Sequence, residues 1–137
     1  MADVSHNVFV QRAYDDTYAL LLAMRDYVSG QSSEDANQLE PQDRMRLSLE
    51  LSRVTRQITE IMAWLMIQKA IAAGEITAEE GTQQAAGQLE LTDDDNDTEN
   101  DTKMEELGKL PLPARSLIDR ARRIAALVRQ LQDGMAA

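Results

Sequence analysis

The sequence predicts an all-α fold, an up-down-up bundle of three helices with a long central helix, in one domain of residues 1–137. Apolar residues recur with helical spacing in three long segments. Leu, Ile, Met and Ala dominate the apolar residues, while Val and Phe, which favour strands, are sparse. Proline or glycine stands at most ends of these segments, where helices begin or stop. A chain of this length can bury one modest core.

The first helix is expected at about residues 7–28. Its apolar positions, spaced by three, four or seven, are Val10, Tyr14, Leu21, Met24 and Val28. Gly30 follows, and glycine is favoured just beyond a helix C-terminus. The polar stretch 31–39 predicts a loop.

The second helix is expected at about residues 41–73. Proline suits the first helical position, which Pro41 would occupy, and no helix breaker follows before Gly74. A heptad seam comprises Leu47, Leu51, Val54, Ile58, Ile61 and Leu65. A second stripe beside it comprises Met45, Leu49, Met62 and Met66. Two adjacent stripes predict that this helix contacts two neighbours.

An acidic insertion is expected at about residues 74–110. Thr77 and Glu80 fit a capping box, which predicts a short helix to about residue 88. The run from Asp93 to Asp101 carries six acids and no apolar residue. Charge repulsion and lack of burial predict that this run is mobile.

The third helix is expected at about residues 113–132, between Pro111 and Gly134. Its apolar face comprises Leu117, Ile118, Ala121, Ile124, Leu127, Val128 and Leu131. At 1.5 Å per residue, the central helix is expected to outrun its neighbours by roughly 15–20 Å. The apolar residues near Trp64 then need a cover, which is either the 77–88 helix folding back or a second subunit. We favour the second subunit, a homodimer.

The distribution of charge separates the insertion from the rest of the chain. The net charge is −10 in total. Residues 74–110 carry 12 acids and 2 bases, while residues 1–73 sum to −3 and residues 111–137 to +3. The chain therefore resembles a near-neutral bundle with an acidic loop. No basic and apolar leader and no apolar run of about 20 residues is seen, so we expect a cytoplasmic protein without a membrane span.

Few residues could take part in catalysis or metal binding. We therefore predict no enzyme activity, no metal and no cofactor. There is no cysteine, and the one histidine, His6, is expected to be solvated. An EF-hand loop starting at Asp95 lacks the sixth-position glycine, because Asn100 stands there. Magnesium-dependent helical nucleotide pyrophosphohydrolases use Glu-x-x-Glu pairs, and this chain has none.

A basic stripe marks the third helix. Arg115, Arg122 and Arg129 lie seven residues apart, so they share one face of the helix. Such a stripe can contact phosphates, can remain solvated beside the acidic loop, or can dock an acidic protein. No helix-turn-helix accompanies it, and the overall charge would repel DNA. We therefore expect no nucleic acid and name these arginines as candidate partner-docking residues.

The central helix resembles the regulator of CtrA degradation family of alphaproteobacteria. The matching block lies in residues 47–76, with a looser fit at Leu110-Pro111 and the third helix. Its motif, also the expected core or dimer seam, comprises Met62, Ala63, Trp64, Leu65, Met66, Gln68, Lys69, Gly74 and Glu75. The resemblance covers about half the chain, and the first helix matches in pattern only.

The resemblance implies a non-enzymatic adaptor for proteolysis. Members of this family work with a single-domain response regulator to deliver cell-cycle substrates to the ClpXP protease at the cell pole, and they are often dimeric. The chain differs in carrying its acidic segment between helices two and three rather than as a tail. Two alternatives stay open: a small helical transcriptional regulator that binds DNA through the third helix, and a structural dimerisation protein.

Overall fold

The computed structural model describes residues 4–84 and 107–136, with side chains described over 6–84 and 107–134. The helices are α1 (Val4–Ser29), α2 (Gln31–Asn37), α3 (Pro41–Ala72) and α6 (Leu112–Ala136), and residues 78–84 form a further short helical stretch. Over the described residues all regular structure is helical, so the predicted all-α class is confirmed. The acidic run, the EF-hand alternative and the part of the predicted 77–88 helix beyond residue 84 lie outside the described residues.

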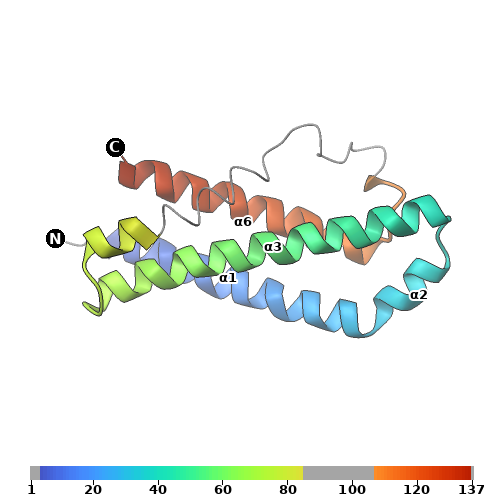
Figure 1. Ribbon diagram of the computed structural model, residues 1–137, viewed down its shortest axis with the longest axis horizontal. Helices are drawn as coiled ribbons and strands as arrows, with labels where there is room; N and C mark the ends of the chain where they lie inside the picture. Colours follow the sequence, from blue (N-terminus) through green and yellow to red (C-terminus); the bar gives the residue numbers. More distant parts are fainter. Residues whose placement is uncertain (1–3, 85–106, 137) are drawn as a thin grey trace.

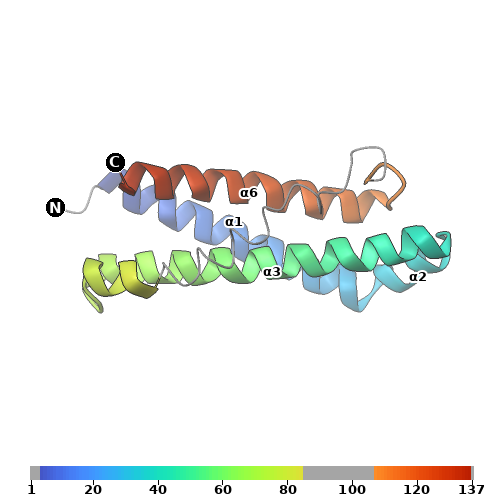
Figure 2. The ribbon, with the colours of Figure 1, turned by 45° about the horizontal axis from the view of Figure 1, so that its top comes forward.

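Three long helices form the bundle, with α3 as the longest element. α1, α3 and α6 lie along one another (Figures 1 and 2), and each packs against the other two. The heptad seam of α3 faces this centre, because five of its six residues are buried and Leu51 packs against the core. The prediction of a three-helix bundle around a long central helix is therefore confirmed.

The predicted up-down-up course was wrong in its last step, because α6 runs parallel to α3. The N-terminal halves of α3 and α6 share one core cluster, and their C-terminal halves share another. Antiparallel order is expected for helices joined by short loops. Here the connection is long, and residues 85–106, at roughly 3.4 Å per extended residue, can cover the length of the bundle. Figure 1 shows α3 and α6 both starting at the end where α2 lies.

The predicted loop over 31–39 was also wrong, since Gln31–Asn37 forms α2. This short helix buries no residue, so it has no apolar periodicity to reveal it. It is held by the Tyr27 hydroxyl, which donates to Asp35 Oδ2 at 2.8 Å, and by Ala36 packing against the core. Asp35 also accepts a bond from Gln31 Nε2 at 3.0 Å. The Tyr27 bond and the packing of Ala36 therefore hold this polar segment.

The core divides into two clusters along the bundle. The first, which we call the α2-end cluster, comprises Leu20, Met24, Tyr27, Leu47, Val54, Ile58, Leu110, Ala114, Leu117, Ile118 and Ala121. The second, which we call the Trp64 cluster, comprises Val10, Ala13, Ile61, Trp64, Leu65 and Val128. Each cluster takes residues from all three long helices, so neither end is held by two helices alone.

The C-terminus of α3 ends in a Schellman motif. Gly74 has a φ of +77°, in the left-handed region that glycine occupies without strain. Its N–H donates to the Ile71 carbonyl at 3.1 Å, and the Glu75 N–H donates to the Ala70 carbonyl at 2.9 Å. These bonds satisfy helix-end carbonyls and turn the chain back toward α3.

The helical stretch 78–84 begins with the predicted capping box. The Glu80 N–H donates to Thr77 Oγ1 at 3.1 Å, and the Thr77 hydroxyl donates to Glu80 Oε1 at 3.2 Å. Gly81 is buried, and the side chains nearest to it are those of Ile67 and Ile71 on α3. The stretch therefore folds back onto the last turns of α3. Over the residues that the structure describes, no helix is long and apolar enough to cross a membrane.

Candidate protein-binding surface

The motif of the central helix is divided between the core and the surface. Trp64, Leu65 and Gln68 are buried, and Met62, Ala63 and Lys69 are half-buried. Met66, Gly74 and Glu75 are exposed, Met66 by 58%. Most of the motif is therefore structural, and Met66 is its one large apolar side chain that faces outward.

The expected overhang of α3 is not seen, because both neighbouring helices are longer than predicted. α1 begins at Val4 and α6 continues to Ala136, so both reach the end of the bundle that holds Trp64. Trp64 is 4% exposed and packs in the cluster with Val10 and Val128. The stretch 78–84 covers Ile67 and Ile71 on another face of this end. The cover therefore comes from the chain itself, which removes the original reason to expect a second subunit.

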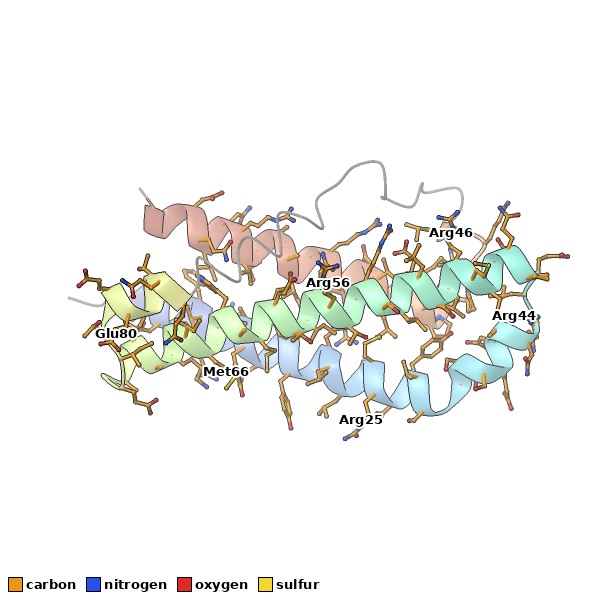
Figure 3. The ribbon with its side chains drawn as sticks, in the orientation of Figure 1. Arg25, Arg44, Arg46, Arg56, Met66 and Glu80 are labelled. Carbon is orange, nitrogen blue, oxygen red and sulfur yellow. The ribbon has the colours of Figure 1, made fainter. Side chains whose placement is uncertain are left out.

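The second stripe of α3 is mostly uncovered within the chain. Met45, Leu49 and Met66 are 76%, 46% and 58% exposed, while Met62 packs against the α2-end cluster. Figure 3 shows Met66 on the edge of α3 opposite to that of Arg46 and Arg56. The prediction that both stripes meet neighbours within one chain therefore holds only for the heptad seam and Met62.

Lys69 joins α3 to α1 beside this stripe. Its Nζ lies 3.9 Å from the centroid of the Tyr14 ring, a cation–π distance. The aliphatic stem of the lysine can then cover apolar surface while its charge stays near water. The charged residue in the motif is thus explained by a contact between helices.

The three predicted docking arginines, Arg115, Arg122 and Arg129, are exposed along one edge of α6. Arg115 and Arg122 line a cavity of about 240 Å³ whose other lining residues are Leu107, Gly108, Ile118 and Asp119. Asp119 itself pairs with Arg123 at 2.9 Å. The cavity thus lies where the turn before α6 meets the first three turns of this helix.

Two carboxylates of α3 are buried. Glu50 is 2% exposed, and its Oε1 lies 3.0 Å from Arg53 Nη1. Glu60 is 7% exposed, and its Oε1 lies 3.5 Å from Arg56 Nε. Each carboxylate is therefore buried beside an arginine of its own helix, as a buried charge requires.

The charges around Glu50 show that the two helices share one electrostatic surface. Burial raises the pKa of Glu50, and the guanidinium groups of Arg53, Arg122 and Arg46 act in the opposite direction. Arg122 belongs to α6 and the other two to α3, so arginines of both helices surround one carboxylate. Figure 3 shows Arg46 and Arg56 on the same edge of α3. We call this set of arginines the arginine groove, after the cavity at Arg115 and Arg122; its members are Arg46, Arg53 and Arg56 of α3 and Arg115, Arg122 and Arg129 of α6.

The sequence revealed only half of this groove. Arg115, Arg122 and Arg129 stood out by their spacing of seven, whereas Arg46 and Arg53 share the same spacing but lay among apolar stripes. The heptad relation between 46, 53 and 60 was the signal that could have found them. Burial of Glu50 and Glu60 had no signal in the sequence, because it depends on how the helices pack together.

Candidate catalytic and metal-binding residues are sparse in the described part of the chain. There, no group of three or more His, Asp or Glu side chains is placed to hold a metal ion. His6 is half-buried, and its Nε2 is enclosed without a hydrogen-bond partner. The expectation that His6 is solvated was therefore wrong for this ring nitrogen.

Comparisons with known proteins agree with this fold. A crystal structure of RcdA from Caulobacter crescentus CB15 matches with a TM-score of 0.71 and 20% sequence identity, over 93% of this chain and 90% of that one. The predicted resemblance to the regulator of CtrA degradation family is thereby confirmed at the level of the fold. No curated protein sequence matches the chain significantly. The model of a family described as "Protein of unknown function (DUF1465)" matches residues 1–137, so the chain belongs to that family.

Proposed function

We propose that this protein is a non-enzymatic adaptor that binds other proteins and presents substrates to the ClpXP protease. The observation that carries the proposal is the RcdA-like arrangement of the three helices over nearly the whole chain. The resemblance in the central helix implies the same class. An adaptor has only to raise the local concentration of its substrate, which needs binding surfaces and no reactive group.

The arginine groove is the surface that we assign to partner docking. It gathers guanidinium groups from two helices, and arginine is enriched at the energetically dominant positions of protein interfaces. A partner with a carboxylate-rich surface would meet complementary charge here, which favours fast association at low salt. A single-domain response regulator and acidic client segments are the partners that we propose, acting at the cell pole.

We also propose a homodimer formed through the exposed stripe Met45, Leu49 and Met66. These are large apolar side chains on one helix face, and an interface core is enriched in methionine. Met66→Glu should convert the dimer to a monomer in sedimentation velocity at fixed concentration. Ala126→Glu, on the exposed side of α6, is the matched control. A wild-type protein that sediments as a monomer at high concentration contradicts the dimer.

The function is tested by a reconstituted degradation assay. Purified protein is added to ClpXP with candidate clients, which are first identified by capture with an inactive ClpP trap in cells with and without the protein. We expect faster degradation of at least one client. Arg115→Glu/Arg129→Glu should lose the effect, while the equally charged variant Arg12→Glu/Arg25→Glu on exposed positions of α1 should keep it. Unchanged rates for every captured client would reject the adaptor.

DNA binding through α6 is the competing function, because its arginines are exposed in a row. A gel-retardation assay at low salt separates the two functions. Sequence-selective binding that Arg115→Glu/Arg129→Glu abolishes would replace the adaptor by a transcriptional regulator. Weak, sequence-independent retention that disappears at moderate salt would leave the adaptor in place.

A further inference from the structure

We propose that the cavity at Arg115 and Arg122 binds a short acidic segment of a partner protein, in which one aliphatic side chain stands between two carboxylates. This site rests on the protein-binding function proposed above and specifies the chemistry of the segment that docks. Its lining belongs to the described part of the chain and comprises Leu107, Gly108, Arg115, Ile118, Asp119 and Arg122.

The size and lining of the cavity suit one side chain of a peptide. Residues 115, 118, 119 and 122 are spaced as i, i+3, i+4 and i+7, so they share one face of α6. Ile118 and Leu107 supply the apolar part of the lining. The volume of about 240 Å³ lies below the roughly 300–1,000 Å³ of sites for drug-sized ligands. The cavity therefore fits an aliphatic side chain better than a cofactor.

The charge of the lining favours an anionic ligand. Arg115 and Arg122 are exposed, and a guanidinium group can bind a carboxylate through two parallel hydrogen bonds. Asp119 is the carboxylate of the lining, and its Oδ2 lies 2.9 Å from Nη2 of Arg123, which is not part of the lining. The negative charge of Asp119 is therefore balanced from outside the cavity, and the two arginines are left to meet an acidic ligand.

Arg122 also interacts with the buried carboxylate of Glu50 on α3. This interaction does not occupy the guanidinium of Arg122, because Glu50 has its own close partner. Its Oε1 lies 3.0 Å from Arg53 Nη1. Arg122 can therefore bind an exposed carboxylate while Glu50 stays paired within α3.

The spacing of the two arginines sets the pattern of the ligand. Seven residues of α-helix separate Arg115 and Arg122, which corresponds to about 10 Å along α6. In an extended peptide, side chains at i, i+2 and i+4 point to the same side and span about 13 Å. Arginine side chains are long enough to absorb the difference. An acidic residue, any residue, an aliphatic residue, any residue and a second acidic residue would thus match the cavity.

A second cavity, between α1 and α6, is less suited to this ligand. It has a volume of about 280 Å³ and is lined by Asp16, Ala19, Arg120, Arg123 and Ile124. The carboxylate of Asp16 would oppose an acidic ligand there, and Arg123 already pairs with Asp119. This cavity therefore serves as an internal control for where the peptide binds.

A synthetic peptide, fluorescein-Gly-Glu-Ser-Leu-Ser-Glu-Gly-amide, tests the site by fluorescence anisotropy with the full chain at low salt. We expect saturable binding. Replacing the leucine of the peptide by glycine should weaken binding at least about tenfold, because the aliphatic side chain is no longer buried. Replacing both glutamates by glutamine should weaken it by up to about 25-fold, as two exposed ion pairs are lost. These comparisons use the wild-type protein, so they do not depend on the folding of a variant.

Protein variants and amide shifts locate the bound peptide. Arg115→Gln and Arg122→Gln should each lower the affinity by up to about fivefold. Arg12→Gln, at an exposed position of α1, should leave it unchanged. In amide NMR spectra the peptide should shift the signals of Gly108 and Ile118 and leave that of Ala19 in place. Shifts centred on Ala19, or equal binding of the glycine-substituted peptide, would overturn the proposal.

The readouts separate this site from the adaptor function. Absence of saturable peptide binding to the wild type rejects the site, while the proposed adaptor function stands until the degradation assay decides it. Binding with the expected dependence on the leucine, the glutamates and the two arginines supports the site, whatever the degradation rates are.

Discussion

At the scale of single residues, Trp64 anchors one end of the bundle, because its side chain is 4% exposed among residues of all three long helices. Trp64→Ala is expected to lower the free energy of unfolding by about 3–5 kcal/mol, the usual cost of emptying such a site. Urea denaturation followed by circular dichroism measures this.

Met66 is the matched control, two residues further along the same helix and 58% exposed. Met66→Ala should change the free energy of unfolding by less than about 0.5 kcal/mol in a monomer, as surface substitutions do. A loss as large as that of Trp64→Ala, dependent on protein concentration, would show that a second copy covers this side chain.

Glu50 gives the protein a pH dependence of known sign. Burial raises its pKa above the ordinary value of 4.5, so the folded state binds its proton more tightly than the unfolded state. Stability linked to this group is present below pH 4.5 and is lost as the pH rises through the raised pKa. Compared with wild type, Glu50→Gln should therefore become relatively more stable between pH 4 and pH 7.

Chemical denaturation of both proteins across that range measures the difference. Glu79→Gln, at an exposed position, is the control. Its free energy of unfolding should differ from that of wild type by a nearly constant amount across the pH range. If Glu50→Gln instead became less stable relative to wild type as the pH rises, the pairing with Arg53 would outweigh burial.

At the scale of elements, glycine decides whether the stretch 78–84 can dock. A Cβ at Gly81 would clash with Ile71 Cδ1 and would lie 3.1 Å from Ile67 Cγ2, so the stretch or these side chains would have to move. Gly81→Ala is expected to release the stretch while the three long helices stay folded. Hydrogen exchange should then accelerate over 78–84, and Ile67 and Ile71 should gain exposure.

Gly134 is the control for this substitution. It lies in α6, and a Cβ there meets nothing within 4 Å. Gly134→Ala should leave exchange over 78–84 unchanged and should stabilise α6 by up to about 1 kcal/mol, the difference in helix propensity. Unchanged exchange in Gly81→Ala would mean that flexible isoleucine side chains absorb the contact.

Periodicity predicted the elements that have an apolar face and failed for the one that has none. The stripes of α1, α3 and α6 come from burial against one another, so their residues repeat with the helical period. α2 buries no residue, and it is held by the bond between Tyr27 and Asp35 and by Ala36 packing against the core. That bond joins a core tyrosine to an aspartate eight residues away, and no local rule singles it out.

The candidate surface could be predicted only where its residues recur with helical spacing on a single helix. Arg115, Arg122 and Arg129 were found because they share a face of α6. The other arginines of the groove and the burial of Glu50 follow from how α3 and α6 align. The residue pattern of each helix by itself does not predict how α3 and α6 align.

At the scale of the whole molecule, the parallel course of α6 relative to α3 is the property that the sequence did not reveal. Spin labels can test it in pairs, since the chain has no cysteine. Labels at the exposed positions Ser48 and Ser116 should lie close together, at the shared N-terminal end of the two helices. Labels at Ala72 and Ser116 should lie on the order of 30 Å farther apart, given the rise of an α-helix.

Double electron–electron resonance measures both distances in the same protein. The reversed order of the two distances would indicate the antiparallel bundle that short connections favour. Two distance populations in both pairs would instead indicate exchange of α6 between two placements.

The alignment of the helices also fixes where attached domains can emerge. Val4 and Ala136 lie at the same end of the bundle, beside the stretch 78–84, and α2 lies at the opposite end (Figure 1). A fluorescent protein fused to either terminus would therefore crowd the same end and leave the α2 end clear. Partners that bind near α2 should tolerate both fusions, whereas partners that bind near Trp64 should be hindered by both. Comparing each fusion with the unfused protein in one cell line would thus report at which end of the molecule a partner binds.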